Sequence, residues 1–389
     1  MPHEIVVFGA SGYTGRLVAE YLAQSYPDLD FAMAGRNRSK LEAVQAEMGI
    51  PESVALMEAD SSDAASLEAM AKSARCVITT VGPYQLYGTG LVEACAAAGT
   101  DYCDLSGEPA WMADTIRDFD EVAKGTGARI VHSCGFDSVP FDLGVLFLQH
   151  QMKEAFDQPA SRVRTRVRAM KGTFSGGTAA SFGATMARAA KEPEVIGLLK
   201  DPFALTPEFK GPEQPHGAKP VYEEDLKSWS APFIMASINT KNVHRTNALL
   251  NQPYGADFVY DEMVLTGDGE QGEAAARHVA GSNAFGDNPP KPGEGPSKEE
   301  RETGFYDIMI VGETRDGDRM TVGVKGKRDP GYGSTSRMIA ECALTLTRDL
   351  SQPEGAGVTT PGAAMGEHLI ERLEAADVMH FKVEDQSTA

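Results

Sequence analysis

The sequence predicts an α/β protein with a doubly wound parallel sheet, followed by a second α+β domain that contains a mixed or antiparallel sheet. Two observations support this fold class. Through the first 135 residues, short apolar runs alternate with amphipathic stretches, which is the pattern of repeated β–α units. After about residue 150 the predicted strands lengthen, and a turn with an Asp-Gly pair at 315–318 joins two of them as an antiparallel hairpin.

The predicted strands of the first part are apolar along their whole length, as expected for parallel strands that helices cover on both faces. The helix predicted at 14–26 has its apolar residues on one face, and Ser39 is expected to cap the next helix. The predicted strands are 5–9, 31–35, 54–59, 76–81, 101–105 and 129–133. The predicted helices are 14–26, 40–48, 63–73 and 88–98.

The second part combines longer strands with more loop. Two stretches rich in proline and charge, 202–229 and 286–303, are expected to be surface loops. The predicted strands are 162–171, 233–239, 258–265, 306–314 and 319–326. The predicted helices are 179–190, 242–250, 334–350 and 361–373.

Composition and charge exclude several classes of protein. The chain has 389 residues and a formal net charge of −20, which disfavours general nucleic-acid binding. Its five cysteines form no C-x-x-C pair, and an odd number of thiols fits a reducing cytoplasm. No set of His, Cys, Asp or Glu has metal-ligand spacing. The longest apolar run, 139–148, is too short to span a bilayer, so we predict a cytoplasmic protein and leave a peripheral membrane or lipid contact open.

A glycine motif at the end of the first predicted strand indicates a nucleotide site. The motif matches G-x-x-G-x-x-G and opens a predicted helix. Its glycines permit a tight turn and a close approach of the backbone to a pyrophosphate, and the helix N-terminus supplies free N–H groups. We therefore predict a Rossmann-type dinucleotide-binding domain over residues 1–135. The predicted contacts are Gly9, Ala10, Ser11, Gly12, Tyr13, Thr14 and Gly15.

The end of the second strand indicates which dinucleotide binds. An NAD site usually has Asp or Glu there to bind the ribose 2′-hydroxyl, but this chain has a basic segment. Guanidinium groups suit a 2′-phosphate, so the predicted cofactor is NADP(H). A solvated basic turn at a helix start is the alternative interpretation. The residues assigned to the phosphate are Arg36, Asn37, Arg38 and Lys40.

Further cofactor contacts are expected where the next two strands end, because ligands of open α/β sheets lie beyond the carboxyl ends of strands. Asp60 and Ser61 end the third strand and are predicted near the adenine, although helix capping explains Asp60 equally well. The fourth strand is predicted to lead along the cofactor toward the nicotinamide. Its last residues and those that follow are Val81, Gly82, Pro83 and Tyr84.

Taken together, several motifs resemble the saccharopine dehydrogenase-like oxidoreductases, especially the branch of trans-acting enoyl reductases of mycobacterial lipid synthesis. The resemblance covers nearly the whole chain and implies an NADP-type Rossmann domain and a homodimer. It also implies a substrate and dimerisation domain over 136–350 and a C-terminal segment, 351–389, that packs back on the first domain. The motifs lie at 7–15, 34–36, 81–84, 102–108, 134–140, 175–178, 329–332 and 360–363.

A reductase needs a proton donor or an oxyanion stabiliser near the nicotinamide, whereas the cofactor carries the hydride. The predicted catalytic candidates are Tyr84, Asp137 and Tyr332, of which the last would reach the cleft from the second domain. The predicted substrate contacts are Tyr87, Asp104, Cys134, Gly135, Phe136 and Asp137.

Each of these candidates also has a structural interpretation. Tyr84 and Tyr87 could serve as aromatic packing, and Cys134 as a small buried side chain. Asp104 and Glu108 could cap the helix that begins near residue 109. His132 is expected to be a hydrogen-bonded core histidine.

An alternating row of arginines occupies the first strand of the second part. Arg162, Arg164, Arg166 and Arg168 should share one face of that strand. The row could meet a phosphopantetheine arm, an acidic carrier protein or a second subunit. The alternative is a solvated sheet face.

The segments expected to line the cleft consist mostly of Gly, Pro, Phe, Tyr and Ser, whereas a site for several carboxylates should be rich in arginine. This composition favours a less charged, acyl substrate. Together with the resemblance, it predicts an NADPH-dependent oxidoreductase that reduces the activated C=C bond of an enoyl substrate in lipid metabolism. Two alternatives stay open. One is an amino-acid dehydrogenase acting on a C=N bond, and the other is a non-catalytic NADP-binding sensor or scaffold.

Overall fold

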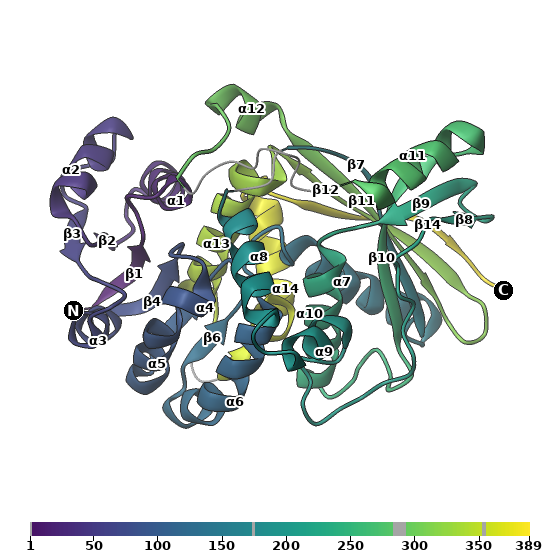
Figure 1. The fold of residues 1–389 in the computed structure, drawn as a ribbon, viewed down its shortest axis with the longest axis horizontal. Coiled ribbons are helices and arrows are strands. Elements are labelled where there is room, and N and C mark those ends of the chain that lie inside the picture. Colours follow the sequence, from purple (N-terminus) through teal and green to yellow (C-terminus); the bar gives the residue numbers. More distant parts are fainter. Residues whose placement is uncertain (1, 173–175, 283–292, 352–354) are drawn as a thin grey trace.

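The computed structural model describes residues 2–172, 176–282, 293–351 and 355–389. Within these residues the chain forms two seven-stranded sheets with a layer of helices between them (Figure 1). The buried apolar side chains of both sheets and of the helices between them belong to one continuous cluster. The two halves of the molecule therefore share a core, and neither sheet is packed independently of the other.

The first sheet is parallel throughout, with the strand order β13-β6-β5-β4-β1-β2-β3. The direction of winding reverses between β1 and β4, which is the switch point of a doubly wound sheet. The predicted Rossmann-type fold is thus confirmed. The strands are β1 (His3–Phe8), β2 (Phe31–Gly35), β3 (Ala55–Glu58), β4 (Ala74–Thr79), β5 (Asp101–Cys103), β6 (Arg129–Val131) and β13 (Gly357–Thr359).

Helices cover this sheet on both faces. The crossovers on either side of the switch point run in opposite directions, which places their helices on opposite faces. On one face α3, α5 and α6 pack in succession, and on the other α1 packs against α13. These helices are α1 (Tyr13–Ser25), α2 (Arg38–Glu47), α3 (Ala64–Lys72), α5 (Thr89–Ala98), α6 (Pro109–Thr126) and α13 (Thr335–Leu344).

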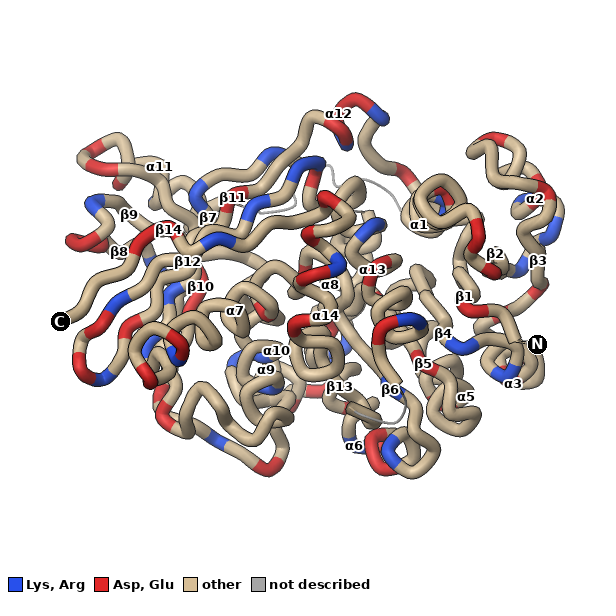
Figure 2. The backbone as a smooth tube through the Cα atoms, turned by 180° about the vertical axis from the view of Figure 1, so that it is seen from behind, with Lys and Arg blue, Asp and Glu red and all other residues tan. Residues whose placement is uncertain are grey.

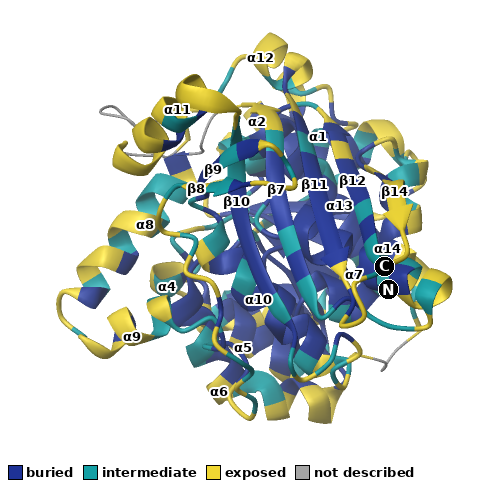
Figure 3. Ribbon diagram, turned by 90° about the vertical axis from the view of Figure 1, so that its right-hand side faces the viewer, coloured by how far each residue is buried: buried dark blue, intermediate teal, exposed yellow. Residues whose placement is uncertain are grey.

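The second sheet has the order β14-β12-β11-β7-β10-β9-β8, in which β7 and β10 pair in parallel and the other neighbours are antiparallel. The predicted mixed sheet is confirmed. Buried residues run along its central strands (Figure 3). The strands are β7 (Arg162–Lys171), β8 (Val221–Glu223), β9 (Ser228–Pro232), β10 (Val259–Gly267), β11 (Phe305–Glu313), β12 (Arg319–Lys327) and β14 (His380–Ser387).

Three helices pack between the sheets: α7 (Val139–Phe156), α10 (Ala236–Leu249) and α14 (Pro361–Ala375). The helix α7 contacts the second sheet, and α10 and α14 reach the first (Figure 1). The remaining helices are α4 (Tyr84–Tyr87), α8 (Gly176–Ala189), α9 (Glu194–Lys200), α11 (Gly269–Gly281), α12 (Lys298–Thr303) and the π-helical turns η1 (Pro330–Ser334) and η2 (Thr345–Asp349). No helix in the described ranges is long and apolar enough to cross a membrane.

Several local predictions were wrong. The strand predicted at 233–239 does not form, because β9 ends at Pro232 and α10 begins at Ala236. The loop predicted at 202–229 contains β8. The helix cap predicted at Ser39 is made by Asn37, whose side chain accepts from the Lys40 backbone N–H at 2.9 Å. Within the predicted loop 286–303, residues 286–292 lie outside the described residues and 298–303 form α12.

The C-terminal segment is divided between the two sheets. Residues 357–359 form β13, which pairs with β6 at the edge of the first sheet. Residues 380–387 form β14, which pairs with β12 at the edge of the second. The helix α13, from the predicted substrate domain, packs on β4 and β5 of the first sheet. The division of the chain into domains at 135 and 350 stays a prediction.

The arginine row on β7 is neutralised within the chain. The four side chains lie on one sheet face, as predicted, and each pairs with one or two carboxylates from other strands of this sheet or from the turn after β8. Arg166 binds Glu223 at 2.5 Å and Asp261 at 2.8 Å, for example. Figure 2 shows basic and acidic positions close together over these strands. The acidic partners of the row are Glu223, Asp225, Asp261, Asp307 and Glu384. This pairing disfavours the row as a docking site for an acidic partner.

Candidate functional site

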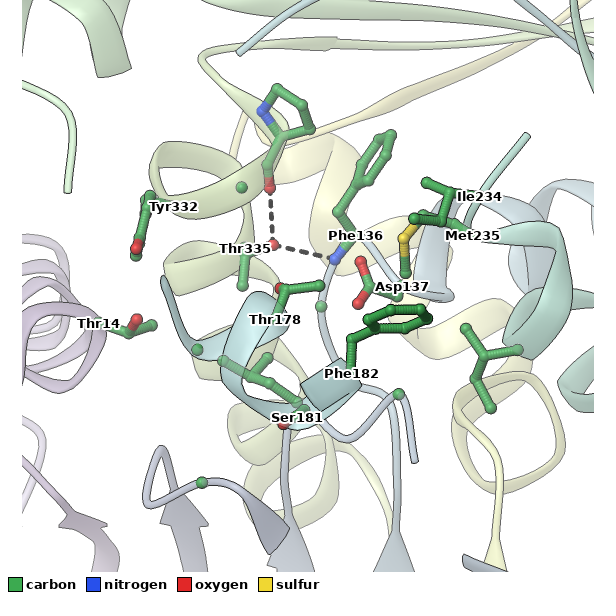
Figure 4. Close-up of a pocket in the computed structure, with 18 of the residues that line it drawn as sticks. Thr14, Phe136, Asp137, Thr178, Ser181, Phe182, Ile234, Met235, Tyr332 and Thr335 are labelled. Atoms are coloured by element: carbon green, nitrogen blue, oxygen red, sulfur yellow. Dashed lines mark hydrogen bonds between the residues drawn. The ribbon is translucent and has the colours of Figure 1, made fainter. Parts of the chain in front are cut away.

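A cavity of about 380 Å³ lies beyond the carboxyl ends of the first sheet's strands and is closed by elements of the second half (Figure 4). It brings together predicted residues that are far apart in sequence. Those that line it are Gly12, Tyr13, Thr14, Gly82, Tyr84, Gly135, Phe136, Asp137 and Tyr332. The cavity is therefore at the sheet edge where an open α/β fold binds ligands.

The glycine motif forms one end of the cavity. Gly9 has a φ of +88°, and a Cβ there would lie 2.8 Å from atoms of Thr80 and Val81. A Cβ on Gly15 would collide with the Gly9 carbonyl. Gly12 begins α1 without a side-chain cap, and no acid occupies the first turn. The free N–H groups and the positive end of the helix thus face the cavity, which suits a pyrophosphate.

Only some of the basic side chains that follow β2 are free to bind a phosphate at the nucleotide end of the cavity. Asn37 caps α2, and Arg38 is bound to Glu42 and to the Leu56 carbonyl, each at 3.2 Å. The side chains of Arg36 and Lys40 are exposed and form no hydrogen bond or ion pair with a described residue. They are the cations available for a 2′-phosphate.

Hydrogen bonds from the Ser62 backbone N–H and hydroxyl lower the pKa of Asp60 most. The positive charge of Arg36, which lies nearby, lowers this pKa further. Those two Ser62 groups lie 2.9 and 2.8 Å from the Asp60 carboxylate. The helix α3 is capped by Asp63, so the capping interpretation of Asp60 was wrong. Asp60 and Ser61 remain predicted adenine contacts.

Tyr13 and Tyr332 join the two halves of the molecule at the cavity. Their rings meet edge to face with centroids 4.7 Å apart. The Tyr13 hydroxyl donates to the Pro296 carbonyl and accepts from Arg301 at 2.5 Å. The Tyr332 hydroxyl donates to the Glu294 carbonyl at 3.0 Å and accepts from the Gly176 N–H at 3.2 Å. Both phenols therefore bridge the glycine motif and segments of the second half.

Tyr84 is buried against Trp111, with stacked rings 5.6 Å apart. Its hydroxyl donates to the Thr79 carbonyl at 3.3 Å and accepts from the Leu105 N–H at 3.1 Å. Burial raises the pKa of Tyr84 well above its usual range. Its proton is thus held by the backbone, which favours the packing interpretation over proton donation.

Glu108 is a site residue whose contacts the sequence did not reveal. Its buried carboxylate accepts from the backbone N–H groups of Tyr84 at 2.8 Å and Gln85 at 2.9 Å, and from the Ser181 hydroxyl at 2.6 Å. Glu108 therefore caps α4, not the helix α6 that follows it. The signal for this role is weak in sequence, because α4 begins after Pro83 without a capping side chain of its own.

Asp137 is the one carboxylate that lines the cavity among the described residues. No described residue donates a hydrogen bond to it, and burial alone raises its pKa from 3.8 to about 7. The helix α7 that follows begins without a side-chain cap, so Asp137 does not cap it either. A carboxyl group with this pKa is partly protonated near neutral pH, as a general acid must be.

Three predicted substrate contacts lie away from the cavity lining. Asp104 is buried and accepts from Tyr102, the Ser106 and Ser133 backbone N–H groups and His132 at 2.7 to 3.0 Å. This network confirms the expectation of a hydrogen-bonded core histidine. Cys134 is buried, with a raised pKa that makes its thiol a poor nucleophile. Tyr87 is exposed on α4.

The other end of the cavity is apolar, and sequence reasoning missed most of it. Met235 and Ile234 precede α10, and Phe182 lies on α8 (Figure 4). No lysine, arginine or histidine of the described segments lines the cavity. Thr335, also missed, accepts from the Phe136 N–H at 3.0 Å and donates to the Pro330 carbonyl at 2.7 Å. The apolar members are Leu105, Phe136, Met170, Phe182, Met186, Leu199, Phe233, Ile234, Met235 and Ile238.

Comparison with known families agrees with the nucleotide end of the site. Residues 5–131 match the model of the saccharopine dehydrogenase NADP binding domain. The residues present fit this cofactor. Gly9 and Gly15 leave room that a Cβ would fill, and the side chains of Arg36 and Lys40 form no ion pair with a described residue. The cofactor is NADP(H), as predicted.

Comparison with whole proteins covers the full chain. A protein of Mycobacterium tuberculosis named as a trans-acting enoyl reductase is 41% identical over 403 residues, covering 96% of each chain. A trans-acting enoyl reductase of Mycobacterium ulcerans is 36% identical, covering 97% of this chain and 96% of its own.

Solved structures share the fold at low identity. Saccharopine dehydrogenase (L-Glu forming) from Saccharomyces cerevisiae aligns with a TM-score of 0.57 at 11% identity, covering 99% of this chain and 100% of its own. Homospermidine synthase from Legionella pneumophila aligns with a TM-score of 0.55 at 9% identity, covering 100% of this chain and 92% of its own.

Proposed function

Because the chain belongs to the family of trans-acting enoyl reductases, we propose that it reduces the C=C bond of an enoyl thioester with NADPH. The chain is an NADP-dependent oxidoreductase, and the enoyl substrate is the part that we infer. The observation that supports it is the composition of the cavity, in which one carboxyl group and a few hydroxyl groups accompany a mostly apolar lining without a basic side chain among the described residues. Such a surface suits an uncharged acyl group with a single polar reacting end.

When bound, NADPH supplies the hydride, and the protein supplies placement and a proton. The glycine motif and the start of α1 would hold the pyrophosphate, and Arg36 with Lys40 would hold the 2′-phosphate. Gly82 and Tyr84 line the cavity between this end and Asp137, where the nicotinamide would lie. Once an acyl chain fills the apolar end, it would exclude water from the reacting atoms.

We assign the proton to Asp137. Hydride addition at the β-carbon of an enoyl thioester breaks the C=C π bond and leaves an enolate. The protonated Asp137 carboxyl then gives its proton to the α-carbon, and the carboxylate takes up a proton from water before the next turnover. The pKa of about 7 keeps a large share of Asp137 protonated at neutral pH. The phenols of Tyr84 and Tyr332 hold their protons in hydrogen bonds to backbone carbonyls.

The alternative of an amino-acid dehydrogenase is disfavoured by charge. An amino-acid substrate brings carboxylates, which proteins bind with arginine or lysine. The cavity has no such side chain among the described residues, and Asp137 would repel an acid. A non-catalytic sensor remains the second alternative, which turnover alone can decide.

Three further proposals concern the protein's setting. The five cysteines are all buried and unpaired, which supports a reducing compartment such as the cytoplasm. The apolar end of the cavity supports a place in lipid metabolism and a contact with lipid. We also propose a homodimer, as the resemblance implies, and sedimentation as a monomer at micromolar concentration would contradict it.

The test is NADPH oxidation, followed by absorbance, with enoyl thioesters and separately with keto acid and amine pairs. We expect turnover with the thioesters alone. Asp137→Asn should lower kcat by about 10²-fold or more while NADPH affinity stays unchanged. Turnover of the keto acid pairs, or of neither set while NADPH binds tightly, would contradict the enoyl assignment.

A further inference from the structure

We propose that α8 is the element that selects the length of the acyl chain, and that Glu108 holds it in position relative to the cofactor. This inference rests on the proposed function, since it names the part of the site that would contact the substrate chain. The support lies in the two faces of the helix, which make different kinds of contact.

One face of α8 is attached to the nucleotide-binding half by polar contacts. Ser181 donates to Glu108 at 2.6 Å, and Thr185 accepts from Gln85 on α4 at 3.1 Å. Arg188 forms an ion pair with Asp114 on α6 at 2.8 Å. The three residues are spaced by four and three positions, so they share one side of the helix.

The adjoining face of α8 is part of the cavity wall. Ser181 and Thr185 border the cavity as well, and beside them Thr178, Phe182 and Met186 line it at a spacing of four, so these three form a second stripe. Phe182 and Met186 are 50% and 47% exposed, which is high for apolar side chains inside a cavity. A ligand that covers the exposed part of these two side chains would bury apolar surface, which would stabilise the complex.

The stripe has the size and position that a chain substrate needs. From Thr178 to Met186 it spans about 12 Å along the helix axis. Asp137 lines the same cavity, and in the view of Figure 4 it is drawn between Phe182 and Met235. Met170 on β7, 39% exposed, also lines the cavity. An unbranched acyl chain with its reacting end at Asp137 would therefore extend along Phe182 and Met186.

Glu108 connects this stripe to the nicotinamide end. Its carboxylate binds both the start of α4, directly after Gly82 and Pro83, and Ser181 on α8. One buried carboxylate thus joins the segment that follows Pro83 to the helix that forms the acyl wall. Glu108 is a positioning residue, because it does not itself line the cavity.

The test compares a short and a long substrate, crotonyl-CoA and trans-dodecenoyl-CoA, in matched variants. Phe182→Ala and Met186→Ala should each lower kcat/KM for the long substrate by about tenfold or more, through KM, because they remove apolar contact area. Their kcat/KM for crotonyl-CoA should stay within about twofold of the wild type. Ile196→Ala removes a similarly exposed side chain on α9 that does not line the cavity, and it should change neither value.

The positioning role has its own signature. Ser181→Ala should lower kcat for both substrates alike, by about fivefold to tenfold, with KM and NADPH affinity unchanged. Ser181→Thr, which keeps the hydroxyl, should restore kcat. An equal loss in both Ser181 variants would overturn the role of the Glu108 contact.

Binding of dodecanoyl-CoA to the NADP complex, measured by calorimetry, separates this inference from the proposed function. If the wild type binds it, Phe182→Ala weakens that binding and no enoyl thioester is reduced, the role of α8 stands and the reaction is wrong. If the wild type reduces crotonyl-CoA but Phe182→Ala affects both chain lengths equally or neither, the role of α8 is overturned. Failure of the wild type to bind dodecanoyl-CoA would also overturn it.

Discussion

The raised pKa of Asp137 predicts that an amide at this position stabilises the folded protein in a pH-dependent manner. The folded-state pKa of about 7 exceeds the unfolded value of 3.8. Between these two pH values the folded protein keeps a proton that the unfolded chain has released, so the free energy of unfolding falls as pH rises. The loss of unfolding free energy caused by this carboxyl is absent below pH 3.8 and reaches its full size above pH 7. Asp137→Asn removes it, because the amide does not ionise.

The size of the effect follows from the difference between the two pKa values. One pKa unit corresponds to about 1.4 kcal/mol, so the cost above pH 7 is at most about 4 kcal/mol. At pH 5.5 the loss is about 2 kcal/mol, because this pH lies about halfway between the unfolded and the folded pKa values. The open side of the cavity admits water, which makes these figures upper bounds. The side chains of Asp and Asn have nearly equal volumes, so the substitution leaves no void.

The assay is urea unfolding of the wild type and Asp137→Asn at pH 5.5 and pH 8, without cofactor. We expect the variant to gain stability at both pH values, and the gain to be about 2 kcal/mol larger at pH 8. Asp60→Asn is the control, because the pKa of Asp60 is lowered and its loss should not stabilise the protein. A gain that is equal at the two pH values, or a loss at pH 8, would refute the reasoning about Asp137.

The same carboxyl predicts that kcat falls about tenfold per pH unit above pH 7, and Asp137→Asn should flatten the kcat profile. Arg36→Ala should weaken NADPH by about ten- to a hundredfold and leave NADH unchanged in fluorescence titration; equal losses would contradict the 2′-phosphate assignment. Gly15→Ala should abolish binding of both dinucleotides, because its Cβ collides with the Gly9 carbonyl; retained binding would contradict that geometry. Arg166→Met leaves Glu223 and Asp261 buried without this partner and should cost about 3 to 5 kcal/mol in urea unfolding, and a neutral result would show that the network is solvated.

The nucleotide-binding half could be predicted closely because its signals are local. Each parallel strand is an apolar run followed by a periodic helix, and the glycine motif acts through the backbone of its own residues. The strand predicted at 233–239 failed for the opposite reason. Phe233, Ile234 and Met235 form an apolar run, but they face the cavity instead of pairing in a sheet. A run of three apolar residues has no periodicity that distinguishes these cases.

The contacts that build the site join residues far apart in the chain, so local sequence patterns could not predict them. Glu108 caps a helix that begins 24 positions earlier in the chain. Ser181 reaches Glu108 across 73 positions. The arginine row on β7 could be placed on one face, but its partners come from strands as distant as β14. Pattern reasoning identified Asp137 as a candidate, whereas only its surroundings set its pKa.

The C-terminal segment has a consequence for the order in which the protein folds during synthesis. Domains generally fold in sequence as the chain emerges from the ribosome. Here β13 completes the edge of the first sheet beside β6, 226 positions after that strand ends, and β14 completes the edge of the second. Neither sheet can reach its final set of strands until nearly the whole chain has been translated. A nascent chain that lacks these segments would expose unpaired edges on β6 and β12, where it could associate with other chains.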